Sequence, residues 1–351
     1  MLLTKKIFSE KILEWYSDHR RDLPWRKTKD PYKVWVSEII LQQTRVDQGL
    51  PYYQKFIKAF PNVKALAAAN QEVVLRLWQG LGYYSRARNM HRCAMQVTSE
   101  YKGSFPQQAS GLKKLTGIGD YTAAAISSIC FNEPAAVVDG NVYRVLSRVF
   151  GITTPINSTE GKKEFSSFAN QLIPQKNPGD YNQALMEFGA LHCTPRIPDC
   201  TNCPLAKGCV ARKQNLQAML PVKIAAAPKK ERYFNYLLLE KDGKIWMKKR
   251  DAGDIWHGLY DFLLIESDKR LNDKMLKLQM IRQFNLTGTP RLIQTLTHIL
   301  THQKLHTSFF HINHPFEFSE NKKLSGKFFS RNEIKKLPKP VFIDKILNLL
   351  N

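Results

Sequence analysis

Apolar residues recur every three or four positions through residues 1–211, and short turns rich in proline and glycine interrupt the pattern. This spacing is typical of amphipathic helices. It predicts helices over residues 5–19, 31–47, 50–59, 63–69, 71–79, 84–101, 106–112, 121–131, 140–150, 158–173 and 180–190.

The pattern changes after residue 232. Tyr233–Leu239 and Ile245–Lys249 flank Lys241-Asp242-Gly243, which is typical of a β-hairpin. Further strands are expected over 258–265, 292–299, 305–312 and 327–330, and helices over 273–284 and 343–350. We therefore expect a mainly α domain over 1–211, a linker over 212–232 and a smaller α+β domain over 233–351.

Composition and charge narrow the class of protein. The 351 residues are 43% hydrophobic, which suits two folded domains of ordinary size. Lys and Arg number 53 against 30 Asp and Glu, a net charge of +23, which favours a polyanionic partner such as nucleic acid. The apolar runs fall far short of the ~20 residues of a membrane helix. We expect a cytoplasmic, nucleoid-associated monomer with no membrane partner.

Four of the six cysteines fall between residues 193 and 209, spaced as Cys193-x6-Cys200-x2-Cys203-x5-Cys209. Four thiolates this close together can enclose one soft-metal centre. Disulfides are disfavoured because no secretion signal is seen. Structural zinc is the remaining alternative, although zinc sites usually pair two CxxC units and only one occurs here. A [4Fe–4S] cluster is the favoured interpretation.

Two glycines and an aspartate mark a second candidate site. Gly117 and Gly119 form a Gly-x-Gly turn before a predicted helix, where free backbone N–H groups favour a phosphate; a packing turn is the plain alternative. Asp139 precedes the helix predicted over 140–150 and is placed to be its N-cap. Because N–H donors favour the anion, we expect a low pKa for Asp139.

Glu38 lies among apolar residues of a predicted helix, in the stretch Ser37–Val46. A partly dry environment there would raise its pKa into the range of a proton donor. The residues alone slightly favour the alternative, an exposed glutamate on the polar edge of the helix.

These motifs together resemble a known family. The cysteine spacing is similar to the cluster loop of endonuclease III-type DNA glycosylases, and the Gly-x-Gly turn resembles their helix-hairpin-helix. Further stretches resemble the MutY family of adenine DNA glycosylases in particular: Leu23–Arg26, Ser37–Val46, Gln79–Asn89 and Gln183–Ala190.

The resemblance implies roles for individual residues. Glu38 would be the acid and base, Asp139 the group that stabilises a sugar cation, and Tyr121 and Asn141 would support both. Gly117 and Gly119 would bind DNA phosphate, and Cys193, Cys200, Cys203 and Cys209 the cluster. The remaining implied contacts, to adenine or to the damaged pair, are Trp25, Arg26, Gln43, Leu81, Tyr83, Gln183, Thr301 and His302.

The carboxyl-terminal region resembles the Nudix-like domain of the same family through Trp256–Phe262. The helix predicted over 273–284 lacks the glutamate run of a Nudix hydrolase, so no pyrophosphatase chemistry is expected. Where the family has Phe-Ser-His to inspect 8-oxoguanine, this chain has Leu300-Thr301-His302; Leu296-Thr297-His298 is an alternative match.

The resemblance implies a base-excision-repair glycosylase that removes adenine from double-stranded DNA where it is opposite 8-oxoguanine or guanine. In the lyase-active endonuclease III branch a lysine follows Gly-x-Gly-x, whereas this chain has Tyr121, so a monofunctional enzyme is expected. The alternatives are a glycosylase for pyrimidine lesions, a catalytically silent iron–sulfur DNA-binding protein and a Nudix phosphohydrolase.

Overall fold

The amino-terminal part of the chain is helical, as the apolar spacing predicts. The expected helices over 5–19 and 140–150 are observed with those bounds, whereas the one expected over 31–47 ends at Leu41. Gln43 has a φ of 56°, which cannot continue a helix. The helices are α1 (Lys5–His19), η1 (Pro24–Arg26), α2 (Pro31–Leu41), α3 (Val46–Ala59), α4 (Val63–Ala67), α5 (Gln71–Leu77), α6 (Ser85–Glu100), α7 (Ala109–Leu112), α8 (Asp120–Phe131), α9 (Gly140–Phe150), α10 (Thr159–Leu172), α11 (Pro178–Leu191), η2 (Ala206–Gly208) and α12 (Val210–Gln214).

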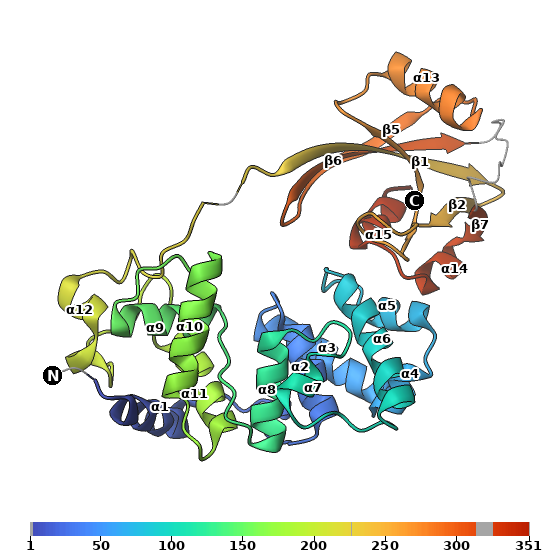
Figure 1. The fold of residues 1–351 in the computed structure, drawn as a ribbon. Coiled ribbons are helices and arrows are strands. Elements are labelled where there is room, and N and C mark those ends of the chain that lie inside the picture. Colours follow the sequence, from blue (N-terminus) through green and yellow to red (C-terminus); the bar gives the residue numbers. More distant parts are fainter. Residues whose placement is uncertain (1–2, 226, 314–325, 351) are drawn as a thin grey trace. The chain divides into compact units, whose positions relative to one another are not determined.

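The computed structural model describes residues 3–225, 227–313 and 326–350 (Figure 1). The chain forms two units, one of Met1–Ala68 with Asn89–Ala225 and the other of Ala69–Arg88 with Ala226–Asn351. Ala69–Arg88 lies within the helical part of the sequence but packs in the second unit. The domain boundaries expected at 211 and 233 remain predictions.

The core of the first unit forms where α1, α9 and α11 meet. Phe8 and Ile12 of α1, Leu146 of α9 and Phe188 of α11 are all buried in one hydrophobic cluster. Four apolar side chains of this size contribute about 1.5–3 kcal/mol each on burial. This packing fixes the amino-terminal end of α9, where Asp139 lies.

The second unit is built on a seven-stranded sheet with the strand order β3-β2-β1-β6-β5, in which β4 pairs with β1 and β7 with β2. β1 and β6 are parallel, and the other pairs are antiparallel. The elements are β1 (Lys230–Lys241), β2 (Lys244–Lys249), β3 (Tyr260–Asp261), β4 (Leu263–Ser267), α13 (Asp273–Phe284), β5 (Arg291–Ile299), β6 (Gln303–Asn313), β7 (Gly326–Ser330), α14 (Arg331–Lys336), α15 (Val341–Leu347) and η3 (Asn348–Leu350).

Successive residues of β1 enter different cores, as the two-residue period of a strand requires. Tyr236 and Leu238 pack with residues of α14 and α15, whereas Leu237 and Leu239 pack with residues of α13. α13 and the pair α14 and α15 therefore cover opposite faces of the sheet (Figure 1). The prediction of a helical domain followed by a smaller α+β domain is confirmed as a fold class.

The sequence reading missed two short helices, α12 and α14. α14 carries a signal that could have been found, because Ser330 and Glu333 form a reciprocal capping box at its start. Among the residues that the structure describes, none of the helices has both the length and the apolar character of a membrane span.

Candidate active site

The first unit contains a cavity of about 1030 Å³, which α2, α8, α9 and α11 help to line. It brings together four residues that sequence analysis proposed for chemistry: Glu38, Tyr121, Asp139 and Asn141. Its wall also contains other proposed residues: Trp25, Arg26, Gln43, Gly119 and Gln183. Residues from five separate stretches of sequence thus meet in one space large enough for a nucleobase.

Glu38 is on α2 and is only 8% exposed, so it is not on a polar edge of the helix. Burial, together with the nearby Asp139 carboxylate, raises the pKa of Glu38 to about 7. A hydrogen bond from Tyr121 and the charge of Arg26 act in the opposite direction. The sequence expectation of a raised pKa at Glu38 is confirmed, and the carboxyl can both give and take a proton near neutral pH.

Asp139 is the N-cap of α9, as predicted. Its Oδ1 accepts from the backbone N–H groups of Asn141 at 2.9 Å and Val142 at 2.8 Å. Its Oδ2 accepts from the side-chain amide of Asn141 at 2.8 Å. These three bonds fix the orientation of the carboxylate at the cavity wall.

The expectation of a low pKa for Asp139 is wrong. Burial raises the pKa of this carboxyl above its ordinary value, although the hydrogen bonds from Val142 and Asn141 and the charge of Arg144 oppose the rise. Sequence alone identified the donors, but it could not reveal how far the packing of the surrounding helices removes Asp139 from water. Desolvation penalises the anion, and here it outweighs the N-cap donors.

Tyr121 lies in the first turn of α8, and its hydroxyl is shared between two neighbours. It forms a hydrogen bond with Glu38, and it also lies 3.4 Å from the sulfur of Met186. Burial makes the largest contribution to raising the pKa of Tyr121 well above its ordinary value, and the charges of Glu38 and Asp139 contribute in the same direction. Tyr121 therefore remains a neutral phenol that can donate to the carboxylate form of Glu38.

Arg144 connects the carboxylate site with the cysteine loop, and sequence reasoning missed it. Its guanidinium donates to the side-chain oxygen of Asn141 at 2.8 Å, to the backbone oxygen of Gly189 at 2.6 Å and to that of Cys193 at 2.7 Å. One buried cation thus holds the residue that orients Asp139 and the first cysteine of the loop. The only feature of the sequence that could have indicated this role for Arg144 is its position five residues after Asp139.

Glu187 is a second residue that sequence reasoning missed. It is 1% exposed and is paired with two arginines, Arg21 at 2.6 Å and Arg26 at 2.7 Å. Burial would raise its pKa, but hydrogen bonds from Arg26 and Arg21 lower it to about 2. The carboxylate therefore stays ionised and holds Arg26 in the cavity wall.

The Gly-x-Gly turn precedes α8 as predicted. Gly117 has a φ of +79°, and an added Cβ would lie 2.8 Å from Cβ of Asn89, so only glycine fits there. Gly119 is the N-cap of α8, and an added Cβ would meet nothing within 4 Å. Gln96 of α6 supports the turn, because its side-chain oxygen accepts from the backbone N–H of Thr116 at 3.0 Å.

The four clustered cysteines share one neighbourhood. Cys209 is buried in the hydrophobic core to which α9 and α11 contribute. Cys193 and Cys203 are partly buried and pack against the same core. Burial, followed by the charges of Cys193, Cys209 and Cys200, raises the pKa of Cys203 to about 12. Across the described ranges, no three Cys, His, Asp or Glu side chains already stand in a metal-binding arrangement. The number, softness and closeness of the thiols nevertheless fit a cysteine-ligated cluster.

Arg148 holds the beginning of the cysteine loop. Its guanidinium donates to the backbone oxygens of Thr194 at 2.7 Å, Pro195 at 2.9 Å and Leu220 at 3.1 Å. The side chain is 2% exposed, so three carbonyl bonds compensate for its buried charge.

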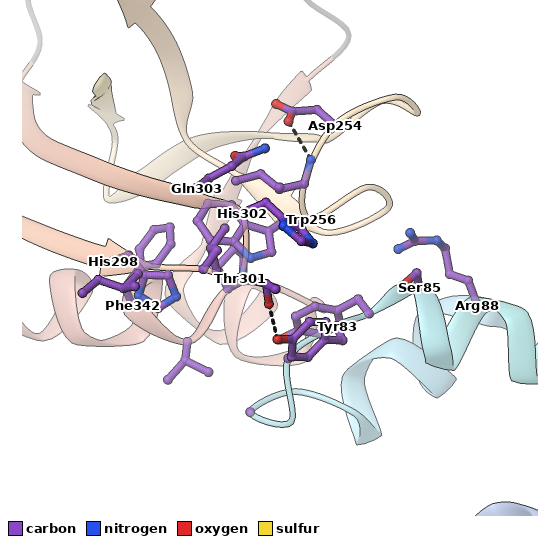
Figure 2. Close-up of a pocket in the computed structure, with 18 residues that line it drawn as sticks. Tyr83, Ser85, Arg88, Asp254, Trp256, His298, Thr301, His302, Gln303 and Phe342 are labelled. Carbon is purple, nitrogen blue, oxygen red and sulfur yellow. Dashed lines mark hydrogen bonds between the residues drawn. The ribbon is translucent and has the colours of Figure 1, made fainter. Parts of the chain in front are cut away.

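The other proposed contact residues lie in the second unit. Leu81 is buried, whereas Tyr83 is 47% exposed, and its hydroxyl forms a hydrogen bond with the hydroxyl of Thr301 (Figure 2). Thr301 and His302 occupy the connection between β5 and β6, and both line a pocket of about 580 Å³ together with Tyr83. Thr297 and His298, the alternative match, are within strand β5.

Comparisons with known proteins agree with this architecture. Residues 36–173 match the HhH-GPD superfamily of base excision DNA repair proteins, and residues 235–349 match the NUDIX domain. The structure of a thermostable thymine-DNA glycosylase is 31% identical and covers 60% of this chain and 97% of its own, with a TM-score of 0.56. A trapped endonuclease III–DNA covalent intermediate shares the fold, with a TM-score of 0.53, 22% identity, and 61% and 100% of the two chains covered. The chain is a helix-hairpin-helix DNA repair protein.

Curated relatives narrow this class. The adenine DNA glycosylase of Buchnera aphidicola subsp. Schizaphis graminum is 32% identical over 99% of both chains. That of Buchnera aphidicola subsp. Acyrthosiphon pisum is 39% identical over 74% of this chain and 75% of its own, and the human one is 43% identical over 61% and 41%. The chain belongs to the adenine DNA glycosylase family and is a DNA N-glycosylase of base-excision repair.

Proposed function

We propose that this enzyme removes adenine from double-stranded DNA where adenine is paired with 8-oxoguanine or guanine, and that it acts as a monofunctional monomer. The single observation that carries the proposal is that Glu38 and Asp139 line one cavity in unequal environments, because Glu38 accepts from Tyr121 whereas Asp139 accepts three hydrogen bonds from Asn141 and Val142. Two carboxyl groups in unequal environments suit the separate roles of proton donor and cation stabiliser.

The reaction begins with adenine extruded from the base stack into the cavity. Glu38, protonated near neutral pH because of its raised pKa, gives its proton to N7 of adenine. The N-glycosidic bond then breaks, its electron pair leaves with adenine, and the sugar becomes an oxocarbenium-like cation. The Asp139 carboxylate, oriented by Asn141, stabilises that cation.

The second half of the reaction returns the proton. Glu38, now a carboxylate, removes a proton from a water molecule, and the resulting hydroxide adds to C1′ of the sugar. The hydroxyl of Tyr121 donates to Glu38 while it is ionised. The products are free adenine and DNA with an abasic site, and Glu38 is protonated again.

The absence of an amine at residue 121 supports a monofunctional reaction. A lyase step needs a neutral amine that attacks C1′ of the sugar and forms a Schiff base. Tyr121 is a phenol with a raised pKa and has no amine, so it cannot form that intermediate. A Nudix phosphohydrolase activity is disfavoured, because α13 carries one acidic residue, Asp273, and no glutamate.

We propose a [4Fe–4S] cluster held by Cys193, Cys200, Cys203 and Cys209. Such a cluster would serve as a structural cross-link of the loop, with no part in proton transfer. The chain's own residues couple this loop to the catalytic carboxylates, because Arg144 bonds both Cys193 and Asn141.

The decisive experiment incubates the full chain with duplexes that carry adenine opposite 8-oxoguanine, guanine, cytosine or thymine. Alkali treatment afterwards cleaves the strand at abasic sites, and a parallel sample without alkali reveals lyase activity. We expect cleavage for the first two duplexes, only after alkali. Excision of pyrimidine lesions with no release of adenine would contradict the proposal.

A further inference from the structure

The segment Ala69–Arg88 is the part of the amino-terminal sequence that folds with the sheet of the second unit. It contains α5, the glycine–tyrosine loop and the first turn of α6, and it presents Tyr83 at its surface. The contacts that this segment makes with strands and helices of the second unit explain why it folds there.

Polar contacts join the segment to three parts of the second unit. Glu72 accepts from Nζ of Lys249 on β2 at 2.8 Å and from the hydroxyl of Tyr260 on β3 at 3.3 Å. Gln79 donates to Asp344 of α15 at 3.1 Å. Glu72 and Gln79 precede the loop that carries Tyr83, and a further contact, from Arg88, follows it.

Arg88 donates from its guanidinium to the backbone oxygen of His257 at 2.7 Å. The neighbouring Gly258 has a φ of +82°, and an added Cβ would lie 3.4 Å from Cδ1 of Leu75. Leu75 is fully buried. The loop after residue 256 therefore touches both α5 and the first turn of α6.

The glycine–tyrosine loop is also tied internally. The indole N–H of Trp78 donates to the backbone oxygen of Gly82 at 3.1 Å, and the guanidinium of Arg86 lies 5.2 Å from the ring of Trp78 and 5.6 Å from that of Tyr83. Tyr83 has a φ of 47°, a conformation that a tyrosine rarely adopts without such support. Its ring is thereby held beside Thr301 (Figure 2).

We propose that Glu72 and Lys249 form a positioning pair that fixes Tyr83 relative to Thr301, so that contact with the base opposite adenine and insertion of Tyr83 into the base stack occur as one event. This inference rests on the proposed function, because it assigns Tyr83 and Thr301 to the DNA. It adds that selectivity for the damaged pair depends on a side-chain pair that touches neither DNA nor the reacting atoms.

The test uses Glu72→Lys, Lys249→Glu and the double charge swap in the full chain. Single-turnover adenine excision is measured opposite 8-oxoguanine and opposite guanine, and amide hydrogen exchange is followed over residues 69–88 and 298–303. Glu10→Lys is the matched control, because Glu10 forms an exposed ion pair with Lys6 of the same helix at 3.9 Å, in the first unit and outside both stretches.

We expect each single variant to lower the ratio of the two excision rates by about threefold, the scale of one partly exposed ion pair, and to speed exchange in both stretches. The swap should restore both readouts, whereas Glu10→Lys should change neither. Exchange that rises in only one stretch, or an unchanged ratio in both single variants, would overturn the proposal.

Failure of the proposed function has a different signature. In that case the wild-type chain releases adenine from neither duplex, whereas hydrogen exchange still reports whether the pair holds the two stretches together. A single variant that fails to fold is recognised by faster exchange throughout the chain. The charge swap then decides, because recovery of both folding and selectivity supports the pair and recovery of folding alone refutes its role in selectivity.

Discussion

The side-chain amide of Asn141 donates to Oδ2 of Asp139 at 2.8 Å, while the side-chain oxygen of Asn141 accepts from Arg144 at the same distance. Asn141 is thus oriented from both ends, so that its amide rather than its oxygen faces the carboxylate. The same carboxylate, that of Asp139, is therefore both the N-cap of α9 and the group proposed to stabilise the sugar cation.

Replacing Asp139 with asparagine separates these two roles. Asparagine is as good an N-cap as aspartate, so α9 should remain formed. Adenine excision should fall by at least about 10²-fold because the anion that faces the sugar cation is lost. Single-turnover excision beside a thermal unfolding curve measures both; unchanged excision would show that Asp139 serves only as a cap.

The pH dependence of adenine excision should reveal the pKa of Glu38 and the effect of Tyr121 on that pKa. Because the pKa of Glu38 is raised to about 7 and the first step needs its protonated form, the rate should fall as the pH rises through about 7. Tyr121→Phe removes a hydrogen bond that lowers this pKa, so the falling limb should move to higher pH. Glu38→Gln should reduce excision by at least about 10²-fold at every pH. A Tyr121→Phe profile displaced to lower pH would refute this assignment.

The proposed cluster at the cysteine loop predicts that the purified protein contains iron. The full chain should carry iron and absorb broadly near ~400 nm, as iron–sulfur clusters do. Cys203→Ser should lose iron, whereas Cys130→Ser, outside the loop, should retain it. Elemental analysis of anaerobically prepared protein measures the metal, and stoichiometric zinc without iron would contradict the cluster.

Thr301 and His302 should contribute to the choice between damaged and normal guanine. Losing one or two hydrogen bonds that only 8-oxoguanine offers should reduce that discrimination by about 1–3 kcal/mol. The measurement compares Thr301→Ala and His302→Ala on both duplexes. Thr297→Ala is the control for the alternative match in β5, and an effect confined to that variant would favour the alternative.

The basic excess should make DNA affinity depend on salt. A net charge of +23 implies several phosphate contacts, each of which releases counterions. The logarithm of the affinity should therefore fall linearly with the logarithm of the salt concentration. Titrations between about 50 and 200 mM salt test this, and a flat response would argue against binding through phosphates.

Much of the local structure follows from the sequence because its causes are local. The helices over 5–19, 140–150 and 273–284 are observed with the predicted bounds, since each has a side-chain cap and an apolar face within its own residues. Burial of Glu38 did not follow from its own helix, whose pattern slightly favoured an exposed glutamate; the family resemblance favoured burial, and the structure shows it. The spacing of the four cysteines predicts a shared metal centre, and that ligand set stays a prediction.

What only the tertiary structure decided depends on groups that are distant in the chain. Glu187 is paired with Arg21 and Arg26 across more than 160 residues, and no local pattern encodes that contact. The raised pKa of Asp139 has the same origin, because the capping donors are local whereas the exclusion of water depends on packing by other helices. The association of Ala69–Arg88 with the second unit also required the fold, since Glu72 and Lys249 meet only when strand β2 has formed.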